Sequence, residues 1–333
     1  MNTSDININD QGVVFKKMIG SYSVYSGERT IQCSLSARLR TVVDNPSHRQ
    51  ARPDKQGGHA DPVAVGDVVR FTGSGNGTGQ IVEVLPRRNR LARRSPVPMP
   101  GAHAFEQVIV ANVDQVVPVF AAANPAPHWN MLDRYLVSAE SMGLTALICI
   151  TKLDLAQDGG SSIDEGLREA AELYRQAGYP VILTSALTGE GIDELKQALK
   201  GRLSVLVGKS GVGKTFLLNT LQPGLGLRVN AVNQVTGKGR HTTSSQEMIR
   251  LEMGGAVVDT PGEREFGLWD VHEDDLAMLF PEMRPLVGRC RFGLDCRHDE
   301  EPGCAIRKAV MAGTISPRRY QSYMRLREEL GAR

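Results

Sequence analysis

Short hydrophobic or alternating runs recur through the first hundred positions of the chain. The runs are Gly12–Phe15, Tyr22–Tyr25, Thr30–Leu35, Asp67–Phe71 and Gln80–Val84. Gly, Pro and Asn separate them, which is typical of short strands joined by turns. About five short strands in so few residues predict a small barrel, with the oligonucleotide-binding (OB) fold as the first choice.

Three polar segments interrupt or follow this barrel pattern. Residues Asn45–Ala60 are polar without periodicity, so we expect a mobile loop there, and Gly73–Gly79 predicts a flexible turn. Residues Pro86–Pro100 are predicted to form a basic linker that leaves the barrel. Its five arginines are Arg87, Arg88, Arg90, Arg93 and Arg94.

After the linker the pattern changes to strands that alternate with helices. The predicted strands are Val113–Phe120, Thr145–Ile150, Val181–Leu183, Leu203–Val207 and Ala256–Val258, and the predicted helices are Trp129–Met142, Ser162–Ala177, Ile192–Leu199 and Thr215–Leu221. Such alternation predicts a mainly parallel sheet with a binding site at the carboxyl ends of its strands. From Asp274 onward the pattern is helical, apart from a compact group of Cys and His. We therefore expect three domains: a barrel at 1–103, an α/β domain at 104–273 and a mainly helical domain at 274–333.

Residues Gly208–Thr215 fit the phosphate-loop pattern G-x-x-x-x-G-K-[ST]. Glycines in such a loop let backbone N–H groups turn around phosphate oxygens, and the following helix adds its positive N-terminal end. Lys214 is expected to reach the β- and γ-phosphates, and the Thr215 hydroxyl to bind Mg²⁺. A chance glycine-rich turn is the alternative. The predicted nucleotide-binding residues here are Gly208, Lys209, Ser210, Gly211, Val212, Gly213, Lys214, Thr215 and Phe216.

Two segments that precede the phosphate loop in the chain predict that the bound base is guanine. Thr151-Lys152-Leu153-Asp154 is a variant of N-K-x-D, in which the Asp carboxylate accepts hydrogen bonds that guanine offers and adenine does not. Ser185-Ala186 is expected to place a backbone N–H on guanine O6. In an ordinary small GTPase the phosphate loop comes first, so this order indicates a circularly permuted P-loop GTPase domain.

The segment Asp259-Thr260-Pro261-Gly262 follows an apolar strand. Asp259 is expected to hold the Mg²⁺ shell, and the Gly262 N–H to sense the γ-phosphate. Taken alone, the D-x-P-G pattern is as typical of a simple turn.

Residues 237–245 occupy the place of a nucleotide-sensing switch loop. A threonine here is expected to complete the Mg²⁺ shell, and we take Thr243 as the candidate, with Thr242 as the alternative. Glu263 stands where many GTPases carry a water-orienting Gln, so another group must place the attacking water. His241 is the candidate for this catalytic role, beside Lys214, and a merely solvated surface His is the alternative.

Three cysteines and a histidine crowd into fifteen residues near the C-terminal end of the sequence. A Cys₃His set suits a tetrahedral Zn²⁺, and four protein ligands leave no open position, so the metal should be structural. Zinc binding is expected to drive the folding of this charge-rich tail. Unpaired core thiols are the alternative, and this is how we interpret Cys33 and Cys149. The predicted ligands are Cys290, Cys296, His298 and Cys304.

Composition and charge narrow the class of protein. The chain is 41% hydrophobic and 23% charged, as expected of a globular protein. No apolar run approaches the ~20 residues of a membrane span, and the N-terminal residues lack signal-peptide character, so we expect a cytoplasmic protein with reduced cysteines. Residues 1–100 carry 14 Lys+Arg against 8 Asp+Glu, and residues 281–333 carry 11 against 7. These basic flanks favour a nucleic-acid partner, although charge differences of this size also arise on solvated surfaces.

Taken together, these motifs resemble the circularly permuted GTPases known as ribosome small-subunit-dependent GTPase A. The resemblance covers nearly the whole chain, in the order barrel, permuted GTPase domain and zinc tail. Besides the phosphate loop, the segments that carry it are Ala111–Gln115, Leu132–Leu136, Arg240–Thr243, Asp259–Gly262, Arg264–Gly267 and Glu301–Cys304.

The resemblance implies a GTP hydrolase that is slow alone, is stimulated by the small ribosomal subunit and acts late in maturation of that subunit. It also implies that the barrel and the zinc domain contact ribosomal RNA, that His241 positions the attacking water, and that Mg²⁺ accompanies GTP. We further expect a monomer. Three departures from the family pattern are Thr151 in place of Asn, Glu263 in place of an apolar residue, and five residues instead of four between Cys290 and Cys296.

Rival functions are open at this point. The first is an RNA-binding assembly chaperone with a weak or vestigial nucleotide site, which the intact Lys214 and Asp259 disfavour. The second is an ATP-dependent phosphotransferase, which Asp154 disfavours. A metal-dependent nucleic-acid module is possible for residues 276–333 alone, but it leaves the centre of the chain unexplained.

Overall fold

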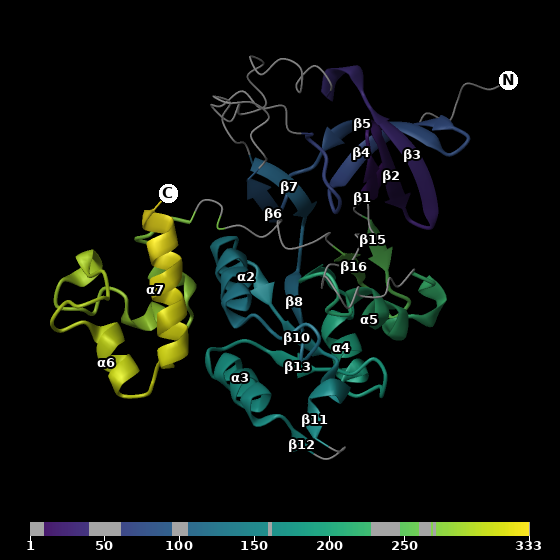
Figure 1. The fold of residues 1–333 in the computed structure, drawn as a ribbon. Coiled ribbons are helices and arrows are strands. Elements are labelled where there is room, and N and C mark those ends of the chain that lie inside the picture. The colour runs from purple at the N-terminus through teal and green to yellow at the C-terminus, as the bar shows by residue number, and fades with distance from the viewer. Residues whose placement is uncertain are drawn as a thin grey trace. The chain divides into compact units, whose positions relative to one another are not determined.

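The computed structural model describes residues 10–39, 61–94, 106–158, 162–227, 247–259, 268 and 271–332. Two compact units share the chain (Figure 1). The barrel unit comprises Met1–Asp114, Leu199–Leu206 and His241–Pro261, and the phosphate-loop unit comprises Gln115–Ala198, Val207–Arg240 and Gly262–Arg333. None of the helices in the described ranges combines the length and the apolar character that spanning a membrane requires.

Five strands of the barrel unit form a closed barrel in the order β1-β2-β3-β5-β4. Strand β1 pairs antiparallel with both β2 and β4, and β3 pairs parallel with β5, which closes the ring. The prediction of an OB-type barrel is thus confirmed. Cys33 lies in its core, as predicted. The strands are β1 Asp10–Met18, β2 Ser21–Ser26, β3 Arg29–Leu35, β4 Val68–Gly75 and β5 Thr78–Val84, and the buried core is Val14, Tyr22, Val24, Ile31, Cys33, Val63, Val69, Phe71 and Ile81.

The predicted flexible turn at Gly73–Gly79 is wrong in extent. Strand β4 continues to Gly75 and β5 begins at Thr78, so only Asn76 and Gly77 form the turn. Both have positive φ, at 52° and 74°. Asn-Gly tolerates this backbone conformation, and the resulting tight turn has the twist that two paired strands require.

The predicted basic linker is also wrong in part. Residues Arg90–Arg94 form β6, which pairs antiparallel with β7, Glu106–Ala111. Arg87 makes two bonds with Asp67, from Nε to Oδ1 at 2.7 Å and from Nη2 to Oδ2 at 2.8 Å. The Asp67 side chain has no exposed surface, and a carboxylate removed from water needs a charged partner. The predicted loop at Asn45–Ala60 lies outside the described residues.

The barrel unit also holds parallel strands β14 and β16, with β15 antiparallel to β16. Their bounds are β14 Leu203–Val207, β15 Met248–Arg250 and β16 Ala256–Asp259. The apolar run predicted to be a strand at Leu203–Val207 therefore has the predicted limits. Its residues from Ser204 to Val207 are buried, which suits a strand covered on both faces.

The phosphate-loop unit contains a parallel set of strands in the order β13-β10-β8, and β9 pairs with β8. Every residue of β8 is buried. The strands are β8 Gln115–Ala121, β9 Thr145–Ala146, β10 Ile148–Thr151 and β13 Val181–Leu183, with a short hairpin of β11 Gln157–Asp158 and β12 Ser162–Ile163. The helical segments are α2 Trp129–Ser141, η1 Leu153–Ala156, α3 Glu165–Gln176, α4 Ile192–Leu199, α5 Lys214–Leu221 and η2 Pro223–Leu225.

The helix predicted from Ser162 begins at Glu165 instead. Ser162 and Ile163 pair with β11, and Asp164 caps the helix by accepting a 3.0 Å hydrogen bond from the Leu167 N–H. An Asp at this position satisfies a backbone donor that the first turn leaves without a partner. Helix α4, by contrast, has the predicted limits.

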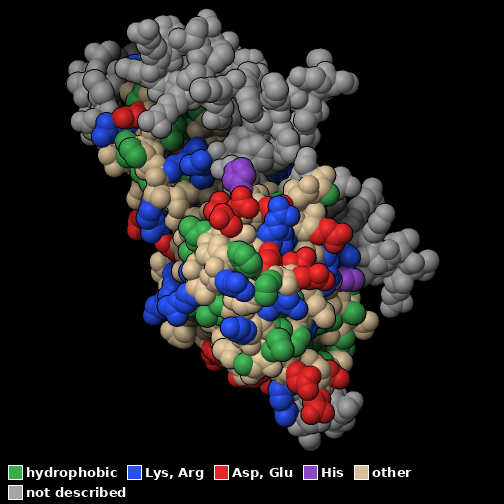
Figure 2. All heavy atoms as spheres, turned by 90° about the vertical axis from the view of Figure 1, so that its left-hand side faces the viewer, with side chains coloured by type: hydrophobic (Ala, Val, Ile, Leu, Met, Phe, Trp, Pro, Cys, Tyr) green, Lys and Arg blue, Asp and Glu red, His purple; other side chains and the backbone are tan. Residues whose placement is uncertain are grey.

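Residues 271–332 form a C-terminal module within the phosphate-loop unit. Its core includes Phe280 and Tyr323, whose rings meet edge to face with centroids 5.7 Å apart. The face that carries this module shows hydrophobic side chains between basic and acidic ones (Figure 2). Its segments are η4 Leu276–Leu279, η5 Arg284–Leu286, η6 Gly293–Asp295, α6 Ala305–Met311 and α7 Pro317–Gly331.

Candidate functional site

The phosphate loop joins β14 to α5 and depends on its glycines. A Cβ at Gly208 would lie 2.2 Å from the carbonyl oxygen of Val119, and Gly211 and Gly213 have φ of 85° and 98°. Residues with side chains rarely adopt such positive φ values, and Gly208 has no room for a side chain. Local sequence and sterics therefore hold the loop in a curve that ends at the N-terminus of α5.

Lys214 is the first residue of α5, and its ammonium group turns back into the loop. Its Nζ donates to the carbonyl oxygens of Gly208 at 2.7 Å and Lys209 at 3.3 Å. This position inside the curve, beside a helix N-terminus, is where the β- and γ-phosphates of a nucleotide are bound in such loops. Thr215 and Phe216 follow on the same helix, and Phe216 is 44% exposed.

Thr151 ties the predicted base-reading segment to the phosphate loop. It is the last residue of β10, and its buried hydroxyl contacts the carbonyl oxygens of Val212 and, at 3.2 Å, Phe120. One hydroxyl has one proton, so it donates to one of these acceptors at a time. The replacement of Asn by Thr therefore leaves a hydrogen-bond donor directed at the loop.

The Asp154 carboxylate is oriented by Ser185, whose hydroxyl donates to Oδ1 at 2.5 Å. Ser185 is fully buried, and its oxygen also accepts from the Thr188 N–H at 3.2 Å. Leu153, which precedes Asp154, is buried and donates its N–H to the carbonyl oxygen of Thr184. The structure thus joins the two predicted base-reading segments, with Ala186 next to Ser185 in the chain.

Lys152 lies along the phosphate loop. A Cβ at Gly213 would be 3.9 Å from its Cε, and its Nζ donates to the Asn124 carbonyl oxygen. Partial burial lowers the pKa of Lys152, and the charge of Asp154 opposes this shift. The aliphatic part of the Lys152 side chain can form one wall of a site for a planar base.

Asp259 ends β16 and lies in register with Leu206 of β14, two residues before Gly208. The predicted site residues His241, Thr243 and Gly262 lie outside the described residues, as do Thr242 and Glu263.

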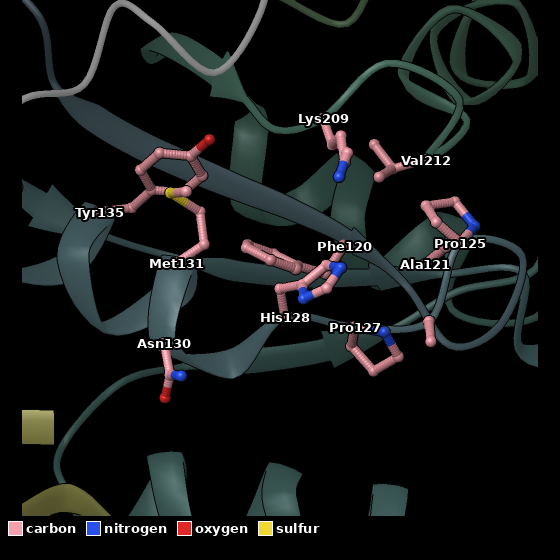
Figure 3. Close-up of a pocket in the computed structure, with 11 residues that line it drawn as sticks. Phe120, Ala121, Pro125, Pro127, His128, Asn130, Met131, Tyr135, Lys209 and Val212 are labelled. Carbon is pink, nitrogen blue, oxygen red and sulfur yellow. The ribbon is translucent and has the colours of Figure 1, made fainter. Parts of the chain in front are cut away.

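A pocket of about 260 Å³ opens beside the phosphate loop (Figure 3). Lys209 and Val212 of the loop form one side, and the start of α2 with the segment before it forms the other. The Lys209 amine and the His128 ring approach the pocket from different sides. Sequence reasoning missed this pocket, although Tyr135 belongs to a segment that carried the family resemblance. The lining residues are Phe120, Ala121, Pro125, Ala126, Pro127, His128, Asn130, Met131, Tyr135, Lys209 and Val212.

The four predicted zinc ligands come together in the C-terminal module. Their ligand atoms all lie within 4.8 Å of one another, and all four residues are buried. Nδ1 of His298 is 3.5 Å from the sulfurs of both Cys290 and Cys304, which are 3.9 Å apart. A tetrahedral Zn²⁺ with ordinary bond lengths requires S–S edges of about 3.8 Å and S–N edges of about 3.5 Å. The donor set and these three distances therefore fit such a metal, and the four residues come together despite the extra residue between Cys290 and Cys296.

Backbone groups around the cluster suit thiolate ligands. The Ala305 N–H donates to Cys290 Sγ at 3.2 Å, and the Arg307 N–H donates to Cys304 Sγ at 3.4 Å. Burial lowers the pKa of His298, which keeps its imidazole in the neutral form that binds metals. Tyr320 donates to the His298 carbonyl oxygen at 2.6 Å and helps to fix the position of this residue.

Comparisons with known proteins agree with this geometry. A family model described as RsgA GTPase matches residues 84–269. The protein of Gemmatimonas aurantiaca named "Small ribosomal subunit biogenesis GTPase RsgA" is 44% identical over 97% of this chain and 98% of its own. A Pseudomonas aeruginosa (strain LESB58) protein with the same name is 44% identical over 78% of this chain and 74% of its own.

Two solved structures match nearly the whole chain. YjeQ from Thermotoga maritima has a TM-score of 0.73 at 32% identity, covering 98% of this chain and 99% of that one. YloQ, described as a circularly permuted GTPase, has a TM-score of 0.68 at 26% identity, and the match covers 100% of this chain and 98% of that one. The predicted fold, with an OB-type barrel, a permuted α/β domain and a helical C-terminal part with a Cys₃His cluster, is confirmed.

Proposed function

The chain belongs to the RsgA GTPase family, a family of GTP-hydrolysing enzymes of ribosome biogenesis, and on this premise we propose that the small ribosomal subunit stimulates its GTP hydrolysis. We place its action late in the maturation of that subunit. The subunit partner is inferred from the relatives named small ribosomal subunit biogenesis GTPase. The observation that carries guanine-nucleotide hydrolysis is the joining of base-reading and phosphate-binding segments within one unit. Thr151 links β10 to the loop at Val212, and Ser185 orients Asp154.

In this proposal each end of the nucleotide meets a separate group of residues. Asp154 selects guanine, Lys152 and Ala186 flank the base, and Leu153 and Ser185 hold this segment in place. The loop from Gly208 to Thr215 binds the phosphates through its N–H groups, with Phe216 next on the helix.

Lys214 stabilises the negative charge that moves onto the phosphate oxygens during hydrolysis. Thr215, Asp259 and Thr243 are the residues that would hold Mg²⁺, which supplies charge neutralisation at the phosphates. We propose that His241 positions the attacking water and that the Gly262 N–H senses the γ-phosphate. These roles for His241, Thr243 and Gly262 rest on the sequence motifs.

We propose one structural Zn²⁺ at Cys290, Cys296, His298 and Cys304. Four buried ligands whose donor atoms all lie within 4.8 Å of one another support it. A domain division at 1–103, 104–273 and 274–333 remains our proposal for how function is distributed along the chain, as does a monomer that works in the cytoplasm.

Ribosomal RNA is proposed to contact the barrel and the C-terminal module through basic side chains. Arg289, Arg291 and Arg297 are exposed beside the metal cluster and are available for phosphate contacts. Arg87 is held by the buried Asp67 and is a poor candidate. Binding through phosphate contacts should weaken as salt is raised, and an affinity independent of salt would argue against this assignment.

GTP is proposed to order residues 237–245 and the segment after Asp259, so that the GTP form binds the maturing subunit and hydrolysis releases it. The chain runs from the second of these segments directly into the C-terminal module, which offers a route for coupling. Equal subunit affinity with GDP and with a non-hydrolysable GTP analogue would exclude this switch.

The deciding experiment is GTP turnover by the purified protein alone, with small subunits and with large subunits. Strong stimulation by small subunits alone is expected. Lys214→Ala should abolish turnover. Turnover unaffected by Lys214→Ala would favour the assembly chaperone with a vestigial site, and competition by ATP as effective as that by GTP would favour a phosphotransferase.

A further inference from the structure

A turn of the C-terminal module exposes an aromatic ring just after two basic residues. Phe292 is 47% exposed and Leu294 is 82% exposed, and Arg289 and Arg291 beside them are exposed as well. The other phenylalanine of the module, Phe280, is completely buried. The exposure of Phe292 is therefore a property of this turn and not of the module as a whole.

The metal cluster and its surroundings hold the turn in one shape. The backbone carbonyl oxygen of Cys290, a predicted metal ligand, accepts the Gly293 N–H at 2.9 Å, and the Phe292 carbonyl oxygen accepts the Asp295 N–H at 3.1 Å. Arg291 donates its N–H to Gly303 at 3.3 Å. A ring on a turn anchored in this way loses little conformational freedom when it binds a partner.

The Arg291 stem lies close to Gly303. Gly303 has φ of 81°, and a Cβ at this position would lie 3.0 Å from Cβ of Arg291 and 3.6 Å from its Cδ. The glycine thus lets the arginine stem lie flat against the turn. The exposed guanidinium is then presented from a fixed base close in sequence to the Phe292 ring.

An exposed ring that follows two exposed arginines in the chain matches the chemistry of an unpaired nucleotide. Bases that are not stacked in a duplex stack on aromatic side chains, and the adjoining phosphates pair with arginine. A base inside an RNA duplex has no free face to offer. The surface around this module carries blue basic side chains next to green hydrophobic ones (Figure 2).

We propose that Phe292, with Arg289 and Arg291, forms a stacking platform for an unpaired RNA base. The C-terminal module thereby distinguishes single-stranded or bulged RNA from duplex RNA. Leu294 lies close to Gly288, because a Cβ added at Gly288 would be 3.5 Å from Cδ2 of Leu294. Leu294 extends the apolar edge of the platform. This inference rests on the proposed RNA-binding function and names the part of the RNA that this surface contacts.

The test uses the full chain and a short single-stranded RNA that contains 2-aminopurine, compared with the same strand in a duplex. Stacking on Phe292 should quench the fluorescence of the single strand. Alanine replacement of a stacking aromatic costs about 1–3 kcal/mol per base, which is about a 5- to 150-fold loss of affinity. Phe292→Ala should show such a loss for the single strand and abolish quenching, with little change for the duplex.

Matched variants separate stacking from folding. Phe292→Trp should retain affinity and quenching, and Phe292→Leu should lose both. Met311→Ala alters another exposed residue of the same module, 85% exposed, and should behave as the parent. Bound metal and circular dichroism of each variant should match the parent.

Three results would overturn the platform. The first is unquenched fluorescence with the parent protein, and the second is an equal loss of affinity for single strand and duplex in Phe292→Ala. The third is a Phe292→Ala variant that binds the subunit more weakly but binds the RNA strand as the parent does. The last would indicate a protein contact. Subunit-stimulated GTP turnover is measured in parallel. If small subunits stimulate GTP turnover but the RNA fluorescence is not quenched, the platform is wrong and the proposed function stands. If the fluorescence is quenched but small subunits do not stimulate turnover, the platform stands and the proposed function is wrong.

Discussion

Asp133 of α2 and Arg319 of α7 form a buried ion pair, with Nη1 of the arginine 2.5 Å from Oδ1 of the aspartate. Their side chains are 1% and 2% exposed. Tyr174 donates to the same aspartate at 2.8 Å and Ser322 donates to its other oxygen, and Arg319 also binds Glu282 at 2.6 Å. The second turn of helix α2 is therefore joined to the C-terminal module, and its first turn lines the pocket beside the phosphate loop.

Arg319→Met should strongly destabilise the phosphate-loop unit. It leaves the Asp133 carboxylate buried without its cation, and breaking a buried pair in this way costs about 3–5 kcal/mol. Urea unfolding followed by near-ultraviolet circular dichroism measures the change. The double variant Asp133→Leu/Arg319→Met should recover part of the loss, because it removes both charges.

A matched control for this variant is Lys196→Ala. It removes an exposed ion pair with Asp193, whose side chain is 95% exposed, and exposed pairs contribute about 0–1 kcal/mol. An Arg319→Met effect no larger than that of Lys196→Ala would contradict the structural role given to the buried pair.

Thr151→Val should weaken guanine-nucleotide binding about tenfold. The valine keeps the shape but cannot donate to Val212, and a buried acceptor without its donor costs about 1–3 kcal/mol. Thr151→Ser and Thr151→Asn keep a donor and should stay close to the parent. Equilibrium titration with a fluorescent GDP measures this, and parent-like affinity of the valine variant would show that the tie is unimportant.

Asp154→Asn should shift the preferred nucleotide from GTP towards xanthosine triphosphate by about a hundredfold, since a polar group that meets the wrong partner rejects the base. An amide offers one donor and one acceptor, which matches xanthine, whereas the carboxylate matches the two donors of guanine. Competition between the two nucleotides is the measurement, with the exposed Asp193→Asn as control. An unchanged preference would remove Asp154 from base recognition.

Gly208→Ala should abolish nucleotide binding, because the new methyl group would lie 2.2 Å from the Val119 carbonyl oxygen and the loop would have to move. Gly73→Ala is the matched control, since a Cβ there meets nothing within 4 Å. Calorimetric titration with GDP compares the two variants. Normal binding by Gly208→Ala would mean that the loop tolerates displacement.

Removal of the metal should unfold the C-terminal module while the barrel persists. Four buried ligands form its centre, and the free energy of metal binding contributes directly to folding in such modules. Native mass spectrometry should give one zinc per chain and none for Cys304→Ala, with loss of the near-ultraviolet signal from Tyr320 and Tyr323. A metal-free chain that keeps this signal would show that the apolar core suffices.

The sequence by itself determined the motifs and the positions of most elements, and for a few elements also their limits. Strand Leu203–Val207 and helix Ile192–Leu199 were predictable because apolar periodicity is a local property. The phosphate loop and the clustered metal ligands were equally readable, since each depends on spacing within a few residues, and the permuted order follows from where such short motifs stand along the chain.

Only the tertiary structure decided which distant side chains meet. Arg319 lies 186 residues from Asp133, Thr151 lies 61 from Val212, and Arg87 lies 20 from Asp67. No periodicity in the sequence marks such pairs. From the sequence alone, a charged residue in a polar stretch is expected to be exposed to solvent, and only the folded structure shows that it is buried with its partner. Burial then enforces the pairing, since an isolated charge away from water is costly. The pocket beside the phosphate loop has the same origin: its walls come from separate segments that packing alone brings together.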